Sequence, residues 1–225
     1  MFGGLDGIIT TFAVVAASVG GSLSSDVIML MGFANLVADG LSMGFGDYLS
    51  SKAELEYTRA EHKREKWELD NYPEGEKREM VELYVKRGMT EDDAHLIVET
   101  MSKYKNLFLD VMMVEELGLM PPDEDDSPAK NGMVTFAAFV FFGIIPLLPF
   151  CFRDATKASD DLNFGVACFL TGCTMLALGA AKAKFTNQSM TQSALLMLLN
   201  GGLAAVAAYL VSWGIASATN TKGVA

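Results

Sequence analysis

Cysteine, histidine and basic residues are scarce in this sequence, and each shortage excludes a class of protein. Three cysteines and two histidines occur among 225 residues, so a structural zinc finger is excluded. The 17 Lys and Arg residues are outnumbered by 28 Asp and Glu residues, which leaves no basic face for a nucleic acid. No EF-hand loop, P-loop or nucleophile motif is present. The chain is also 51% hydrophobic, which is too apolar for a disordered acidic protein.

The few cysteines do not form a Cys-x-x-Cys pair. They are Cys151, Cys168 and Cys173, and all three lie in apolar stretches. We therefore expect them to be small buried hydrophobic side chains rather than metal ligands or a disulfide.

Acidic and apolar residues are segregated along the chain. Residues 53–130 contain 21 acidic and 11 basic side chains, whereas the other 147 residues contain 7 acidic and 6 basic ones. The apolar part is long enough to cross a bilayer several times, which excludes an ordinary soluble enzyme. We expect residues 1–52 to form transmembrane helices one and two, 53–130 a cytosolic helical domain, and 131–225 transmembrane helices three to five.

Five apolar stretches are each long enough for a membrane-spanning helix, which needs about 20 residues. They are Leu5–Leu23, Val27–Ser51, Gly132–Phe152, Leu162–Ala181 and Ser193–Ser217. The link between the first two is too short for anything but a tight turn, which predicts a helical hairpin. No basic residue precedes Lys52, so we expect the first span to serve as its own targeting signal.

The basic residues predict the orientation in the membrane. If the acidic segment is cytosolic, 14 of the 17 Lys and Arg residues lie on the cytosolic side. With five spans, the N-terminus then lies in the cytosol and the C-terminus lies outside or in a lumen.

The acidic segment is predicted to be a three-helix insert in an all-α membrane protein. Its first helix covers about Ala53–Leu69 and continues directly from the second span. Pro73 breaks this helix and opens the next, which ends near Gly88. Thr90 caps a third helix, which is predicted to run to about Leu117.

Polar side chains inside the apolar stretches are candidates for function, because a charge inside a membrane is costly. Asp6 lies near the start of the first span, and the second contributes four positions spaced by four residues: Asn35, Asp39, Met43 and Asp47. This spacing predicts a stripe along one helix face, and its mixture of carboxylate, amide and thioether suits a divalent cation. The alternative is that Asp6 and Asp47 lie hydrated at the two membrane interfaces.

Two glycine pairs accompany these polar residues. Gly3 and Gly7 form one Gly-x-x-x-Gly pair, and Gly40 and Gly44 form another. Such pairs permit close helix approach, and we expect the first pair to bring span one against its copy in a second chain.

The acidic segment carries a second set of candidate ligands. Glu65 and Glu68 share one helix face, and so do Glu76 and Glu79 on the next helix. If these helices fold antiparallel about Pro73, the two pairs converge, and converging carboxylates need cations to offset their repulsion. The third helix offers Met112, Met113, Glu115 and Glu116. The alternative is a solvated acidic face with neighbouring lysines as partners.

Three segments make the sequence resemble the vacuolar iron transporter family. They are DGIITTFAVVAA in the first span, NLVADGLSMGFGDYLSSKAE in the second, and FLDVMMVEELGL at the end of the acidic segment's third helix. The resemblance covers nearly the whole chain. It includes the acidic insert, which the nodulin-like relatives of the family lack.

The resemblance implies a homodimeric antiporter that moves ferrous iron from the cytosol into a vacuole-like compartment in exchange for protons. It places the path between the two copies of span one, with Asp6 and Met43 as path residues. It also implies that the insert gathers metal at the cytosolic mouth of the path, with ligands Glu65, Glu68, Glu76, Glu79, Met112, Met113 and Glu116.

The sequence departs from the family pattern in the second span. Where members of the family carry a glutamate in the first half of this span, Asn35 stands here, and Asp39 lies one helical turn further on. We expect Asp39 to supply the missing carboxylate, and we expect metal preference or proton coupling to differ from the family pattern.

The mixed ligand set bears on which metal is carried. Carboxylate oxygens alone would suit magnesium or calcium, and thioether sulfur shifts the preference toward Fe²⁺ and similar metals. We expect Fe²⁺ as substrate, Mn²⁺, Co²⁺ and Zn²⁺ as further candidates, protons and membrane lipid as partners, and no prosthetic group. Three alternatives stay open: a manganese-preferring transporter of the same type, a membrane-anchored ferroxidase or iron-storage protein, and a structural membrane protein with an acidic docking helix. The absence of a clear pair of Glu-x-x-His motifs argues against the ferroxidase.

Overall fold

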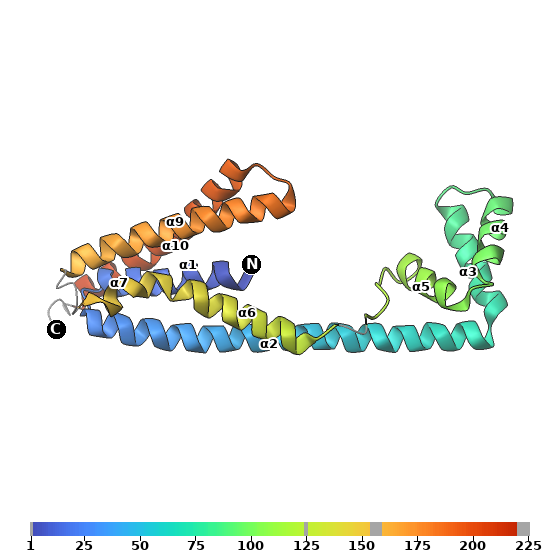
Figure 1. Ribbon diagram of the computed structural model, residues 1–225, viewed down its shortest axis with the longest axis horizontal. Coiled ribbons are helices and arrows are strands. Elements are labelled where there is room, and N and C mark those ends of the chain that lie inside the picture. The colour runs from blue at the N-terminus through green and yellow to red at the C-terminus, as the bar shows by residue number, and fades with distance from the viewer. Residues whose placement is uncertain (1, 124–125, 154–158, 220–225) are drawn as a thin grey trace. The chain divides into compact units, whose positions relative to one another are not determined.

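The computed structural model describes residues 2–123, 126–153 and 159–219, and every regular element within these ranges is a helix (Figure 1). The chain divides into two compact units. We call Met1–Tyr48 with Ala129–Ala225 the membrane unit, and Leu49–Pro128 the acidic unit.

Within the described ranges, five helical stretches are long and apolar enough to cross a membrane, in agreement with the predicted all-α membrane fold. They are α1 (Phe2–Gly20), the apolar part of α2 (Ser25–Asn71), α6 (Pro128–Gly143) continued by η1 (Ile145–Leu147) and α7 (Leu148–Cys151), α9 (Asp160–Thr186) and α10 (Met190–Ala218). The third stretch is interrupted because Pro146 and Pro149 lack the N–H that a continuous helix needs, so a 3₁₀ turn joins its two parts.

Helix α1 is the central element of the membrane unit. Its apolar window is 56% buried, against 28% or less for the other four spans, and it packs on α9, α10 and η1. The predicted hairpin with α2 is present, since the turn between Gly20 and Ser25 is tight and Val15 and Ile28 share one apolar cluster. That cluster also contains Leu36, Phe139, Leu147, Phe150 and Ala167.

Both glycine pairs bring helices of the same chain together. A Cβ added at Gly3 would lie 2.8 Å from the carbonyl oxygen of Thr135 on α6, and one at Gly44 would lie 2.9 Å from that of Gly132, also on α6. The pairs do permit close approach, as expected. Since α6 already fills the glycine face of α1, however, the argument from Gly3 and Gly7 to contact with a second chain is wrong.

The three cysteines are exposed, and the expectation that they are buried is wrong. Cys168 and Cys173 lie on outward faces of α9, and Cys151 lies at the end of α7. In a membrane helix the outward face meets lipid, so a small apolar thiol is compatible with exposure there as well as with a protein core.

The acidic unit consists of the end of α2, then α3 (Pro73–Lys86), α4 (Glu91–Met101) and α5 (Lys105–Glu115). Pro73 lies in the first turn of α3, Gly88 has the positive φ of a helix terminator, and the Thr90 side chain caps α4, as the sequence predicts. The single helix expected from Thr90 to Leu117 is wrong, because a turn at Ser102–Tyr104 divides it into α4 and α5.

That turn allows the acidic unit to form its own apolar core. Helix α5 buries Phe108 and Leu109 against Val98 of α4 and Met80 of α3, and Leu69 of α2 closes the cluster. One straight helix of that length would carry the side chains of α5 past the core. The break therefore follows from the burial of apolar surface.

Candidate metal cluster and polar path

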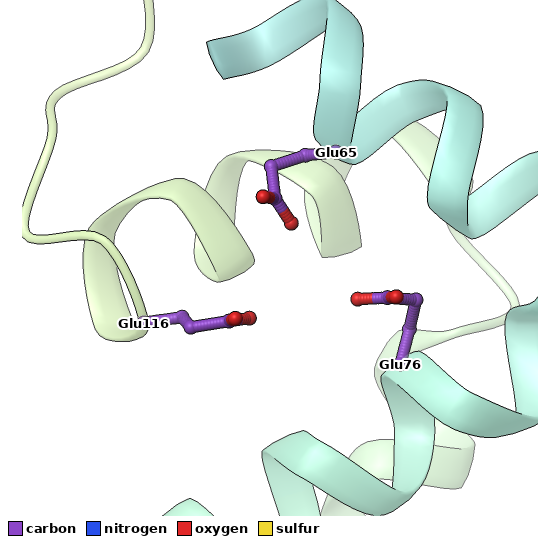
Figure 2. A group of neighbouring side chains, drawn as sticks. All are labelled: Glu65, Glu76 and Glu116. Carbon is purple, nitrogen blue, oxygen red and sulfur yellow. The ribbon is translucent and has the colours of Figure 1, made fainter.

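Three carboxylates from three parts of the acidic unit point toward one another (Figure 2). Glu65 comes from α2, Glu76 from α3, and Glu116 from the residue that follows α5. Each offers an oxygen, and these three oxygens lie within 4.8 Å of one another. Such proximity is unfavourable for ionised carboxylates unless protons or a cation offset the repulsion.

The apolar core of the acidic unit positions these carboxylates. Glu65 lies one turn before the buried Leu69 on α2, and Glu76 lies one turn before the buried Met80 on α3. Glu116 follows the buried Met112 by one turn. Packing of Leu69, Met80 and Met112 in one cluster therefore brings the three acidic positions together at its edge.

Burial and mutual repulsion favour the protonated forms of the cluster. The pKa of Glu76 is raised from 4.5 to about 7, first by burial and then by the charges of Glu79, Glu65 and Glu116. Burial also raises the pKa of Glu65 and of Glu116, with neighbouring carboxylates adding to the effect. If a cation binds here, its affinity should fall as pH falls, because the carboxylates must lose their protons to bind it.

Arg64 is the positive charge paired with this cluster. Its guanidinium lies 2.7 Å from a carboxylate oxygen of Glu61, 2.9 Å from Oε1 of Glu65 and 3.9 Å from Oε2 of Glu68. The other oxygen of Glu65, Oε2, is buried and has no hydrogen-bond partner among the described residues. Glu65 is thus held by one oxygen, and the second is free to bind a cation. The prediction missed Arg64, although its spacing of three and four residues from Glu61 and Glu68 is a signal that could have found it.

The other predicted ligands lie around this group. Glu68 is half-buried, and its charge acts on Glu65 and Glu76. Glu79 is exposed and lines a cavity of about 420 Å³ together with Glu116 and Lys86. Glu115, also noted in the sequence, is paired with Arg87.

The two predicted methionine ligands are fully buried. Met112 belongs to the apolar core of the acidic unit, and Met113 is equally inaccessible. The structure thus brings three carboxylates together and leaves the thioethers in or beside the core. Whether any of these residues binds metal stays a prediction.

The predicted polar stripe lies on one side of α2 in the membrane unit. Asn35, Asp39, Met43 and Asp47 are all half-buried, between exposed positions and a buried row that includes Leu36, Gly40 and Gly44. The hydroxyl of Thr135 on α6 donates a hydrogen bond of 2.6 Å to Asp47. The side-chain nitrogen of Asn35 is buried and has no partner among the described residues.

Asp6 of α1 joins the stripe from a second helix. It is half-buried, and its charge interacts with that of Asp39. The contact of Gly7 with Phe139, and of Gly40 with the same phenylalanine, places both acids at one level of the helix bundle. Two carboxylates from two helices therefore lie near each other inside the membrane unit.

Comparison with known proteins supports a single family. A family model described as the VIT family matches residues 1–213. A vacuolar iron transporter of Toxoplasma gondii is 47% identical over 213 residues, which cover 93% of this chain and 70% of the relative. One of Plasmodium falciparum is 40% identical, covering 94% of this chain and 79% of the relative. Vacuolar iron transporter 1 of Arabidopsis thaliana is 31% identical, with 92% and 81% covered.

Proposed function

Because this chain belongs to the VIT family, we propose that it is a secondary active transporter that moves ferrous iron out of the cytosol in exchange for protons. The destination is a vacuole-like compartment, as the names of the relatives suggest. The function is transport rather than catalysis, and Fe²⁺ is the substrate.

The observation that carries this proposal is the pairing of two kinds of acidic site in one chain. The acidic unit presents three convergent carboxylates outside the apolar spans, and the membrane unit contains Asp6 and Asp39 within them. A protein that only stored or oxidised iron would need the first but has no use for the second. Acids buried in spans are costly, and their most common use is to carry ions or protons.

Proton exchange follows from the chemistry of carboxylates. A carboxylate binds a divalent cation when it is ionised and a proton when it is not, so each ion displaces the other. Glu76, with its pKa near 7, is poised for this exchange at the pH of a cytosol. Asp6 and Asp39 would perform the same exchange inside the membrane, driven by the proton gradient of an acidic compartment.

A second candidate is a transporter of the same type that prefers manganese. The cluster is formed by oxygen atoms, and Met112 lies in the apolar core rather than beside them. An all-oxygen set favours harder cations such as Mn²⁺, whereas thioether participation would favour Fe²⁺. Competition between the two metals in one uptake assay would decide which is preferred.

The proposed assembly is a homodimer formed along α1. The glycine face of α1 is occupied by α6, but Ala13 and Ala17 on another face are half-buried in the single chain. Cysteines placed at these two positions should crosslink between chains in membranes. Crosslinks that form only from positions on α9 or α10 would overturn this assignment.

Proteoliposome uptake is the direct test of the proposed function. Purified protein is reconstituted with a metal-quenched dye or a pH-sensitive dye inside, and Fe²⁺ is added outside under reducing conditions. Metal entry accompanied by proton exit is expected, with protein-free liposomes as the control for leakage. Metal entry that ignores an imposed pH gradient would contradict antiport, and the absence of metal entry would contradict transport.

A further inference from the structure

A cavity with a mixed polar and apolar lining opens beside Asp6 in the membrane unit. It has a volume of about 670 Å³ and lies between α1, α10 and the end of α9. Its lining includes Asp6 and Ile9 from α1, Lys182 from α9, and Gln192, Met197 and Asn200 from α10. This cavity lies on the α10 side of Asp6 and is not lined by the polar stripe of α2.

The face of α10 that lines this cavity is unusual for a membrane helix. Ser193, Met197 and Asn200 are spaced by four and three residues, so they lie along one face. Asn200 interrupts an apolar run and is exposed in the single chain. A primary amide in contact with hydrocarbon would be unfavourable, so Asn200 indicates that the cavity contains water.

The size and chemistry of the cavity suit a hydrated cation. A divalent ion with six waters needs roughly 180 Å³, since each water takes about 30 Å³. The cavity is several times larger, and its lining offers one carboxylate, three amide oxygens and one thioether. Lys182 also lines the cavity, and because it is exposed in the single chain its long stem allows the ammonium to extend into bulk water.

We propose that this cavity is a hydrated binding chamber for the transported divalent cation. Asp6 supplies the charge, Gln192 and Asn200 supply neutral oxygen ligands, and Met197 supplies a thioether. The inference rests on the proposed function and deepens it, because it adds α10 to a path otherwise confined to α1 and α2. Asp6 then connects the chamber to Asp39 and the α2 stripe.

Cysteine accessibility tests the chamber without requiring transport. In full-length protein whose three native cysteines are replaced by alanine, Asn200→Cys is compared with Leu203→Cys. Leu203 is 70% exposed on the same helix and does not line the cavity, so it is the matched control. A charged, membrane-impermeant methanethiosulfonate reacts with thiolates, which form only in water.

We expect Asn200→Cys to react at least about tenfold faster than Leu203→Cys, and Mn²⁺ to slow that reaction about fivefold or more. Adding Asp6→Asn should remove the protection by Mn²⁺ while the reaction itself remains. Gln192→Cys is a second reporter should Asn200→Cys fold poorly.

Three results would overturn the chamber: equal reaction rates at positions 200 and 203, no protection by Mn²⁺, or protection that survives Asp6→Asn. The outcome is separable from that of the uptake assay. If Mn²⁺ protects the thiol in Asn200→Cys but proton-coupled uptake is absent, the chamber is retained and antiport is rejected. If proton-coupled uptake occurs but Mn²⁺ gives no protection, antiport is retained and the chamber is rejected.

Discussion

The acidic unit and the membrane unit differ in how many carboxylates they bring together. In the acidic unit, Glu65, Glu76 and Glu116 lie within 4.8 Å of one another, and Arg64 pairs with the edge of the group. In the membrane unit Asp6 and Asp39 form a pair at one level of two helices, and Asp47 lies further along α2, where it is paired with Thr135. Water and mobile cations offset the repulsion among three carboxylates in the first environment, whereas the low dielectric of the second makes each additional charge costly. We therefore expect the cluster to collect metal and the acids of the spans to pass it on.

The strongest test of this contrast is Asp39→Asn. The amide keeps the size and polarity of Asp39 but removes its charge and its proton site, leaving one acid at this level of the spans. We expect metal-driven proton movement in proteoliposomes to be abolished. Metal binding by the acidic unit, measured by calorimetry on the same protein in detergent, should be unchanged.

A rescue variant sharpens the Asp39 result. Asn35→Glu combined with Asp39→Asn should recover part of the activity if the carboxylate has only moved one turn along the stripe. Full transport by Asp39→Asn alone would assign Asp39 to packing and leave Asp6 as the charged residue of the path.

The next test removes two carboxylates from the cluster of the acidic unit and leaves the membrane unit unchanged. Glu65→Gln with Glu76→Gln should weaken divalent-metal binding by about tenfold or more, because two of three converging carboxylates are lost. Glu74→Gln is the matched control, since Glu74 lies on α3 but is exposed and paired with Lys77 outside the cluster. Calorimetry with Mn²⁺ on full-length protein measures both, and equal affinities of the double variant and the control would reject the cluster as the binding site.

The stability and metal affinity of the acidic unit should depend on pH. Because the folded-state pKa of Glu76 is raised to about 7, the folded protein binds more protons than the unfolded chain between pH 4.5 and 7. The metal-free acidic unit should therefore lose stability as pH rises through this window, while metal affinity increases. Thermal melts at pH 5.5 and 8 should show a larger stabilisation by Mn²⁺ at the higher pH, and Glu76→Gln should reduce the difference.

The smallest expected effect concerns Arg64. Its guanidinium competes with metal for the cluster, so Arg64→Gln should strengthen metal binding by a few-fold at low salt, an effect that added salt reduces. Arg59→Gln, an exposed arginine on the same helix, should leave the affinity unchanged. Weaker binding by Arg64→Gln would instead show that Arg64 is needed to orient Glu65.

Local sequence patterns predicted much of this architecture. Apolar runs of spanning length located five membrane helices, and the spacing by four placed Asn35, Asp39, Met43 and Asp47 on one half-buried face. Pro73, Gly88 and Thr90 marked helix ends because their chemistry acts on the local backbone.

What the sequence did not predict depends on contacts between distant residues. The turn at Ser102–Tyr104 has no strong breaker and exists because α5 must reach the core of the acidic unit. The glycine pairs indicated close approach but not the partner, which is α6 of the same chain. Likewise, which glutamates converge depends on how three helices pack, so Glu79 and Glu116 could not be told apart by spacing alone.

The glycine contacts of the membrane unit also define where it can bend. Backbone meets backbone where α6 touches Gly3 and Gly44, and no rotamers are available there to absorb a shift. Helix α10 is held to α1 in the same way at Gly20, against the carbonyl of Tyr209, but is separated from it by the cavity near Asp6. We therefore expect α1 and α10 to move relative to each other about a hinge at Gly20. When metal is added, spin-label distances between the two helices should change for labels near Asp6 and stay fixed for labels near Gly20.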